Sequence, residues 1–570
     1  FDIEQNRLRD IGQIGIRVIN ASDVTIADNR LREIGRDGID LRSSNGVVIS
    51  ENRVRNVGRN GISVSGSNDF DVENNRLSNI TLDGVVITNS SDLTVSENTI
   101  DGTVNAIRLV RVNDATVEEN TLSNVQNGVN ARFVNNLDVL NNGASGSGTG
   151  IWIRNGDDVT VAGNELADYA NGISADTVTE LNVLDNTVTS LNGINGILIV
   201  NSADAIVENN FVDPFQNGIA VLSSDGAQIL NNHLVDNGTN ILVSDTANAV
   251  VSGNTVEGGG IGIDFENSDN ATINNNTIEN TVIGIGAANS DNLSFASNTI
   301  SDSGTGVLLA NSNSADFFGD NLIGNIIGLQ LDNSSDTHVE NVTFTDNFTG
   351  LVASNGSANT LVSDSAFNGG FTAISLAGEG TSLQFEGDGS TFTGNTLYFT
   401  LSEGAMVGEV LDASQQTFDG VRANDFTLLQ LLDAESKTFD FNDSVLVGNV
   451  FYKDIAVFGS ALDEFVRNRS ADVLGTTFSF AGQTILKGLT DGFYSFRIQE
   501  VNLSLLSATT PVLNLSANNL GSLSPAAGGS AEQLASLSPS AGGSGSGDCG
   551  NSFLGGGYSP SYNASSCSAQ

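Results

Sequence analysis

The stretch DVTIADNRL at residues 23–31, completed by Gly38 and Ile39, decides the fold of this chain. Val24 and Ile26 alternate with polar residues, which is the period of a β-strand, and the Asp-Asn pair that follows them is typical of a turn. The same arrangement returns at intervals of 22 or 23 residues along most of the chain. Short strands and turns that recur at one interval predict a solenoid in which each repeat forms one coil.

Two columns of residues keep the phase of this repeat. One column is asparagine and runs from Asn6 through Asn29 to Asn321, and the other is mostly glycine and runs from Gly15 to Ala373. An asparagine at a tight corner can adopt left-handed geometry and bond to the asparagine of the next coil. Strands this short find partners only in the neighbouring coils, so their sheets are parallel. We therefore predict an all-β fold, a right-handed parallel β-helix of about 17 coils with 22–24 residues each.

The repeat at residues 23–39 resembles the parallel β-helix repeat of the pectate-lyase-like superfamily, which includes the NosD-like periplasmic and surface proteins. The resemblance covers about residues 1–395 and implies the fold. It implies no single activity, because the superfamily contains lyases, hydrolases, epimerases, phage tailspikes, adhesins and inert scaffolds.

The composition divides the chain into three regions. Residues 1–395 carry the repeat. Residues 396–510 are predicted to form a C-terminal β-rich cap or assembly domain, because an open solenoid end exposes core and unpaired strand edges. Residues 511–570 form a Ser/Gly/Ala/Pro-rich, low-complexity tail. Cys549 and Cys567 in this tail either pair as a disulfide in an oxidising compartment or remain free thiols.

The charge of the chain excludes some partners. There are 67 acidic and 22 basic residues, a net charge of −45, which repels nucleic acid and anionic membranes. No window is apolar enough over its length to span a bilayer. The composition favours an extracellular or cell-surface location, in a bacterium. The sequence opens in the middle of a coil, so we expect a processed chain or a fragment.

No catalytic set is recognisable in the sequence. The solenoid contains two histidines, His233 and His338, which the repeat separates by several coils. Signatures of alginate epimerases, calcium-binding nonapeptide repeats, nucleophile elbows and zinc proteases are all missing. We therefore predict no catalytic residue and no resident cofactor, with calcium as the one ion to consider.

The candidate calcium ligands are Asp69, Asp92 and Asp114, which share one corner of successive coils. Carboxylates about 5 Å apart repel one another, and a bound divalent cation would relieve that repulsion. Aspartate is also a common turn former, and this second interpretation needs no metal.

A basic and aromatic patch is predicted on the outward positions after the Gly-Ile corner. Its members are Arg108, Arg132, Trp152 and Arg154. A tryptophan flanked by arginines can stack on a sugar ring and bind an anionic glycan. The alternative is a tryptophan that packs under a loop or a neighbouring subunit.

Two further sets of outward residues predict self-assembly. Leu198, Val200, Leu222 and Leu242 form an apolar patch that soluble monomers seldom leave bare. Arginines follow the ladder asparagine in four successive coils, and stacked arginines repel unless carboxylates interleave with them or an acidic partner lies opposite. These are Arg7, Arg30, Arg53 and Arg76.

The sequence therefore supports two functional hypotheses. The first is a secreted or cell-surface structural solenoid that assembles head-to-tail into a filament, sheath or layer, with an upstream capping domain as the alternative explanation of the arginine-rich end. The second is an extracellular polysaccharide-active enzyme of lyase or epimerase type, or a glycan-binding surface protein.

Overall fold

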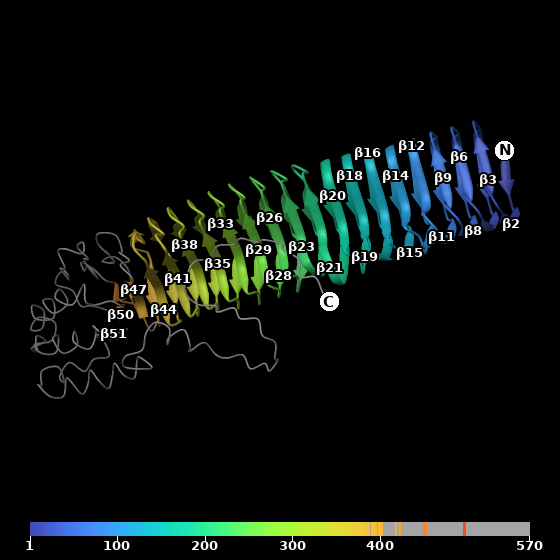
Figure 1. Ribbon diagram of the computed structural model, residues 1–570. Helices are drawn as coiled ribbons and strands as arrows, with labels where there is room; N and C mark the ends of the chain where they lie inside the picture. The colour runs from blue at the N-terminus through green and yellow to red at the C-terminus, as the bar shows by residue number, and fades with distance from the viewer. Residues whose placement is uncertain are drawn as a thin grey trace, which may run out of the picture. The chain divides into compact units, whose positions relative to one another are not determined.

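The computed structural model describes residues 1–387, 389–395 and 397–402, and beyond them the short strands at 417–418, 421–422, 449–452 and 494–497. Contacts divide the chain into two compact units. The first is Phe1–Val450 together with Arg497–Glu500, and the second is Phe451–Phe496 together with Val501–Gln570. The first unit contains the solenoid (Figure 1). The predicted cap lies almost wholly outside the described residues, and the predicted tail with Cys549 and Cys567 lies entirely outside them.

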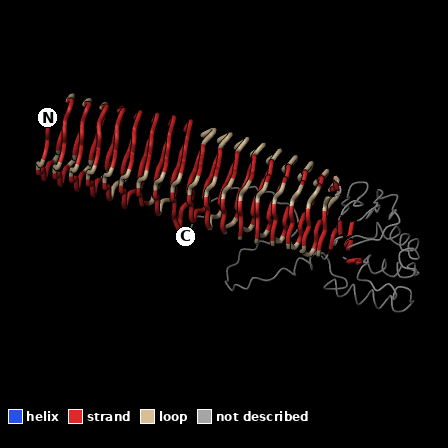
Figure 2. Tube along the Cα trace, turned by 180° about the vertical axis from the view of Figure 1, so that it is seen from behind, coloured by secondary structure: helices blue, strands red, loops and turns tan. Residues whose placement is uncertain are grey.

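Each coil of the solenoid has three sides. In the second coil these are β4 (Ser22–Ala27), β5 (Arg30–Ile34) and β6 (Ile39–Arg42), and we name the sides face A, face B and face C in that order. They pair in parallel with β7 (Asn45–Ser50), β8 (Arg53–Val57) and β9 (Ile62–Ser65) of the next coil. The whole is a right-handed parallel β-solenoid of about 18 turns, which confirms the predicted fold class. Figure 2 shows strands and turns, and no helix, along the described solenoid.

In the middle of the solenoid the strands of two sides run together without a break. Faces C and A are continuous in the five strands from β12 (Asp83–Ser96) to β20 (Asn171–Leu184) that span both faces. Faces B and C are continuous in β21 (Thr187–Val200) and β23 (Phe211–Leu222). Later coils return to separate short strands, such as β26 (Thr239–Ser244) and β29 (Ile261–Glu266), up to β47 (Leu397–Ser402). The continuous C-to-A strands are β12 (Asp83–Ser96), β14 (Asn105–Glu118), β16 (Asn127–Leu140), β18 (Thr149–Ala162) and β20 (Asn171–Leu184).

The core is made of aliphatic columns that become aromatic toward the C-terminal end. Ile26 and Leu31 are among the largest fully buried side chains of the first coils. Further along, Phe295 stacks on Phe317 with ring centroids 4.2 Å apart. Phe367 stacks between two more phenylalanines, one of them Phe344 at 4.5 Å. Because the strands are in exact one-to-one register, each side chain packs on its equivalent in the next coil.

The asparagine column forms a buried hydrogen-bonded ladder. Asn52 donates from its backbone N–H and from Nδ2 to Oδ1 of Asn75, each at 3.0 Å, and Nδ2 also donates to the carbonyl of Ile26 at 2.7 Å. The prediction that Asn321 is the last member of this ladder is wrong. Asp320 occupies the ladder, where it accepts from Asn298, and Asn321 lies one position on in β37 (Asn321–Ile323).

The corners of the coils use left-handed residues. Asp23 and Asp28 have φ values of 52° and 55°, and later coils place Asn, Asp, Glu, Gly or Ser at these positions. The glycine column serves another purpose, because a Cβ on Gly38 would lie 2.5 Å from the carbonyl oxygen of Gly61 in the next coil. Corners and close approach together fix the repeat, and they leave the outward side chains free to differ.

Candidate functional site

The predicted basic and aromatic patch lies on face C, on three neighbouring strands. In the register of β14, β16 and β18, Arg108 is next to Asn130 and Asn130 is next to Trp152. The second outward column of the same strands places Arg132 beside Arg154. The strands that carry these residues lie side by side in the N-terminal half of the solenoid (Figure 1). The structure therefore brings the four predicted residues together on one surface.

Two arginine–aromatic pairs define the chemistry of this surface. The guanidinium carbon of Arg132 lies 4.5 Å from the centroid of the Trp152 ring, and Trp152 is half-buried. In the adjacent corner, the guanidinium carbon of Arg111 lies 5.6 Å from the centroid of Phe133. Both distances are within the range of cation–π attraction. We name this surface the Trp152 patch, and its members are Arg108, Arg111, Asn130, Arg132, Phe133, Trp152 and Arg154.

The arginines of the patch differ in their charge partners. Nε of Arg108 lies 2.9 Å from Oδ2 of Asp83, and Nε of Arg154 lies 3.2 Å from Oδ2 of Asp176. Arg111 and Arg132 have no carboxylate within 4.0 Å in the part of the chain that the structure describes. Their positive charges are therefore available to an anionic ligand.

Asn130 adds a polar group to the patch. Its side chain is 5% exposed, and Nδ2 donates to Oδ1 of Asn105 at 3.1 Å. Its own Oδ1 is buried and accepts no hydrogen bond from any described residue. A buried acceptor without a donor costs free energy, so Asn130 is a polar residue that the fold alone does not explain.

Phe133 is a member of the patch that sequence reasoning missed. Its φ is 54°, in the left-handed region, and its side chain is 51% exposed. For a bulky residue this conformation costs about 1–2 kcal/mol, and such strain clusters at functional sites. The signal was present in the sequence, because the same corner position holds asparagine in other coils, for example Asn89 and Asn155.

A polar ladder beside the patch was also missed. Nδ2 of Asn105 donates to Oδ1 of Asp83 at 2.7 Å, and Nδ2 of Asn127 donates to Oδ1 of Asn105 at 3.0 Å. Asp83 is 4% exposed, so Arg108 compensates a nearly buried charge. Arg108 is for that reason a supporting residue of the patch rather than a free cation.

The predicted apolar patch lies further along face C. In register, Leu198 is next to Ala220 and Ala220 is next to Leu242, while Val200 is next to Leu222. All four large side chains are half-buried, so they are neither enclosed in the core nor fully exposed to solvent. Cover by another chain or segment stays a prediction.

The predicted assembly arginines lie on face B. Arg7 pairs in register with Arg30, Arg30 with Arg53 and Arg53 with Arg76, on β2 (Arg7–Ile11), β5, β8 and β11 (Arg76–Ile80). All four side chains are exposed. We call this set the arginine ladder, and it runs along the side of the rod.

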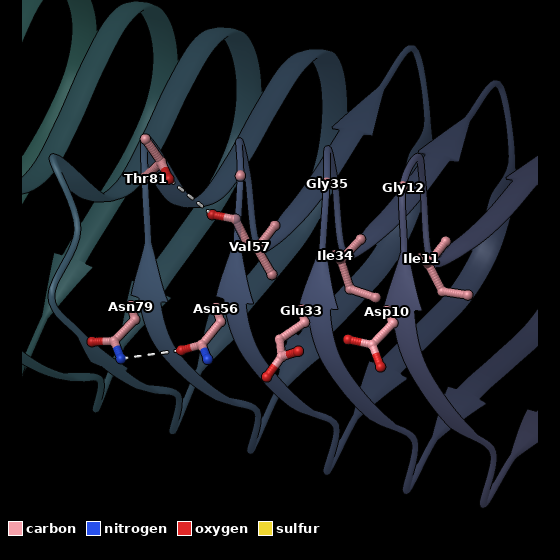
Figure 3. Close-up of a pocket in the computed structure, with 11 residues that line it drawn as sticks. Asp10, Ile11, Gly12, Glu33, Ile34, Gly35, Asn56, Val57, Asn79 and Thr81 are labelled. Carbon is pink, nitrogen blue, oxygen red and sulfur yellow. Dashed lines mark hydrogen bonds between the residues drawn. The ribbon is translucent and has the colours of Figure 1, made fainter.

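A shallow hollow of about 560 Å³ lies next to face B in the same coils (Figure 3). One edge of it carries Asp10, Glu33, Asn56 and Asn79 in a row, and Nδ2 of Asn79 donates to Oδ1 of Asn56 at 3.2 Å. The row repeats once per coil and does not converge on one point, so it offers no enclosed binding site.

The candidate metal residues do not form a cluster. Asp69, Asp92 and Asp114 are exposed and follow one another coil by coil at left-handed corners. Among the described residues, no group of three or more His, Cys, Asp or Glu side chains is placed to hold a metal ion. Calcium binding at this column stays a prediction.

Two family models match the chain. One, described as "Right handed beta helix region", matches residues 14–166 and 284–397, and the other, described as "Periplasmic copper-binding protein (NosD)", matches residues 129–301. The chain is a right-handed parallel β-helix repeat protein. Within it, residues 129–301 are similar to the NosD repeats. Among curated proteins, none matches this sequence.

Several solved structures are similar to the solenoid. DFA-IIIase from Arthrobacter chlorophenolicus, without its lid, is 12% identical over 51% of this chain and 83% of that chain, with a TM-score of 0.30. The catalytic unit of an α-1,3-glucanase from Streptomyces thermodiastaticus is 15% identical over 54% of this chain and 59% of that one, with a TM-score of 0.31. A surface adhesin of Streptococcus pneumoniae is 11% identical over 62% of this chain and 86% of that one, with a TM-score of 0.27.

The described residues do not fit the copper ion that the second family model names. Copper sites in proteins use His, Cys and Met ligands. His233 lies 3.1 Å from Glu257 and His338 lies 4.0 Å from Asp316, and neither gathers further ligands among the residues described. We therefore assign no copper chemistry to the solenoid. No helix in the described part is long and apolar enough to cross a membrane.

Proposed function

We propose that this protein is a secreted, periplasmic or cell-surface β-solenoid that binds an acidic glycan on face C. The observation that carries the proposal is the Trp152 patch, where an arginine without a carboxylate partner lies over a half-buried tryptophan. The description of the NosD family model, which names a periplasmic protein, supports the location.

Each part of the patch has a role in this proposal. A sugar ring can stack on the part of the Trp152 ring that the guanidinium of Arg132 leaves uncovered. Arg111 and Arg132 offer guanidinium groups to a carboxylate or sulfate, with two parallel hydrogen bonds where the geometry allows. Face C continues in both directions with the same strand spacing, which suits an extended chain.

Binding is tested by calorimetry with acidic oligosaccharides, such as oligouronates, against a neutral glucan of equal length. We expect Trp152→Ala to weaken binding of the acidic ligand about tenfold or more, because aromatic anchors dominate such contacts. The matched control is Phe318→Ala, which removes a 52% exposed aromatic from β36 (Asp316–Phe318) on face A. Equal affinity of wild type and Trp152→Ala for every acidic glycan would refute the proposal.

An activity screen separates a binding protein from an enzyme. The wild-type chain is incubated with pectins and alginates, and unsaturated or epimerised products are sought. Product formation that Trp152→Ala abolishes would extend the proposal to a polysaccharide-active enzyme. Binding without turnover supports the role of a glycan-binding surface protein.

Self-assembly is the second candidate function, and one observation favours it. The arginine ladder is a row of exposed like charges on one side of a chain whose net charge is −45. The head-to-tail arrangement expected from the sequence has no further support in the geometry, since the ladder lies along the side of the rod.

A further inference from the structure

The arginine ladder is a row of exposed guanidinium groups that form no close ion pair with a described residue. Arg7, Arg30, Arg53 and Arg76 are in register on successive coils, and none has a carboxylate within 4.0 Å among the described residues. The neighbouring column on the same strands differs, because Arg9 and Arg32 each have Glu33 within reach. A depression of about 400 Å³ runs along the ladder, and Asp28 and Glu51 line it together with the four arginines.

The fold does not require arginine at these positions. Adjacent strands place like charges opposite one another, which destabilises a sheet. The next coils use Thr99 and Thr121 at the same register, and their strands pair as well as those of the arginine coils. A surface that opposes its own stability and is not needed for the fold points to a partner of opposite charge.

A second column in the chain has the same spacing as the arginine ladder and the opposite charge. Asp69, Asp92 and Asp114 stand on successive coils at the corner between faces C and A, and all three are exposed. None of them has an arginine or lysine within 4.0 Å in the described part of the chain. We call this set the aspartate ladder. Both ladders advance by one strand spacing per coil, about 4.8 Å, so their charges stay opposite one another over several coils.

The two ladders cannot meet within one molecule. The aspartate ladder lies at the beginning of face A, as Asp69 does in β10 (Asn68–Glu73), and the arginine ladder lies at the beginning of face B, as Arg76 does in β11. The width of one face of the solenoid therefore separates them in every coil. Only a second copy can bring an aspartate ladder against the arginine ladder.

We propose that the arginine ladder of one molecule docks side by side on the aspartate ladder of a second copy of this chain. The contact joins two different surfaces, so each copy keeps one ladder of each kind free for the next neighbour. Such a heterologous contact adds molecules until the arrangement closes or forms a sheet or fibre. The proposal is independent of glycan binding, because neither ladder includes a member of the Trp152 patch.

The test uses three charge-reversed variants in sedimentation velocity and light scattering at low and high salt. The first is Arg30→Glu with Arg53→Glu, the second is Asp69→Arg with Asp92→Arg, and the third combines all four changes. An arginine can adopt the left-handed conformation that this corner needs, since Arg111, three residues before Asp114, has a φ of 55°. The wild type is expected to self-associate at low salt and to dissociate at high salt.

Each single-ladder variant should weaken self-association at least tenfold, and the combined variant should restore it, because the charges are then exchanged. The matched control combines Gln13→Glu, Arg36→Glu and Leu82→Glu at the exposed corner after face B, which makes the same change in net charge as the first variant and should leave association unchanged. Melting temperatures of all variants establish that they fold. Trp152→Ala should associate like the wild type.

Two results would overturn the proposal. One is a wild type that stays monomeric at low salt over the accessible concentrations. The other is a combined variant that stays as weak as the single-ladder variants. If a monomeric wild type instead binds heparin and the first variant does not, the occupant of the arginine ladder is an external polyanion.

Discussion

Face B has the same backbone at its two ends and different side chains on its surface. In the first four coils the leading outward position holds the arginine ladder, while later coils place Thr255, Thr277 and Thr299 in register at that position. The strands β28 (Thr255–Glu257), β31 (Thr277–Glu279) and β34 (Thr299–Ser301) pair in parallel as the arginine strands do. The difference teaches that buried columns specify the coil, and that outward columns are free to carry binding surfaces.

The largest expected effect breaks a buried column. Asn75→Leu leaves the backbone N–H of Asn52 without its acceptor. It also removes the bond from Nδ2 of Asn52 to Asn75 and the bond from Nδ2 of Asn75 to the carbonyl of Ile49. Each buried unsatisfied group costs about 1–3 kcal/mol, so we expect a loss of about 3–5 kcal/mol, seen in urea unfolding and as local hydrogen exchange. The control is Thr121→Leu, which changes an exposed residue of face B and should shift the midpoint only slightly. A small effect of Asn75→Leu would contradict the role of the ladder.

The second expected effect concerns the buried carboxyl that interrupts the asparagine ladder. Burial raises the pKa of Asp320 to about 6, and its Oδ2 has no hydrogen-bond partner among the described residues. Because the folded pKa is above the unfolded one, stability is gained as pH falls from 7 toward 4 and lost as pH rises through about 6.

Asp320→Asn should remove this pH dependence and stabilise the protein by about 2 kcal/mol at pH 7.5, since a shift of one pKa unit is worth about 1.4 kcal/mol. Urea midpoints at pH 5 and pH 7.5 provide the measurement. The opposite sign, a wild type that is more stable at pH 7.5 than Asp320→Asn, would show that the carboxylate is stabilised by charge in the fold.

The third expected effect sharpens the contrast between fold and function in the Trp152 patch. Phe133→Asn replaces a strained residue by the one that other coils use, and should stabilise the solenoid by about 1 kcal/mol. The same change removes the aromatic partner of Arg111 and should weaken glycan binding. Urea unfolding measures the change in stability, and calorimetry on the same sample measures the change in glycan binding. A Phe133→Asn variant that is less stable than the wild type would contradict the proposed backbone strain at Phe133.

The smallest expected effect lies within the arginine ladder itself. Arg53→Thr gives the third coil the residue of the later coils and removes two like-charge contacts, with Arg30 and Arg76. Each such contact costs a few tenths of a kcal/mol, so we expect a gain of about 0.5 kcal/mol for dilute protein at low salt. The gain should vanish at high salt, and a gain that persists there would indicate a cause other than charge.

The sequence predicted the fold well because the columns that specify it are buried and therefore uniform. The asparagine and glycine columns held their phase, and the error at Asn321 arose because Asp320 breaks the uniformity by one position. The surface was harder to predict. The pairing of Arg108 with Asp83 and the stacking of Arg132 on Trp152 depend on register between coils, which the repeat indicates, and on side-chain direction, which it does not.

The one-to-one register has a consequence for how this rod can change over time. Gain or loss of one complete repeat moves everything beyond it by one strand spacing, about 4.8 Å, and keeps every side chain on its own face. A gain of part of a repeat would turn all later faces around the axis and bury the wrong residues. The distance between the Trp152 patch and the arginine ladder along the rod can therefore change only by whole coils.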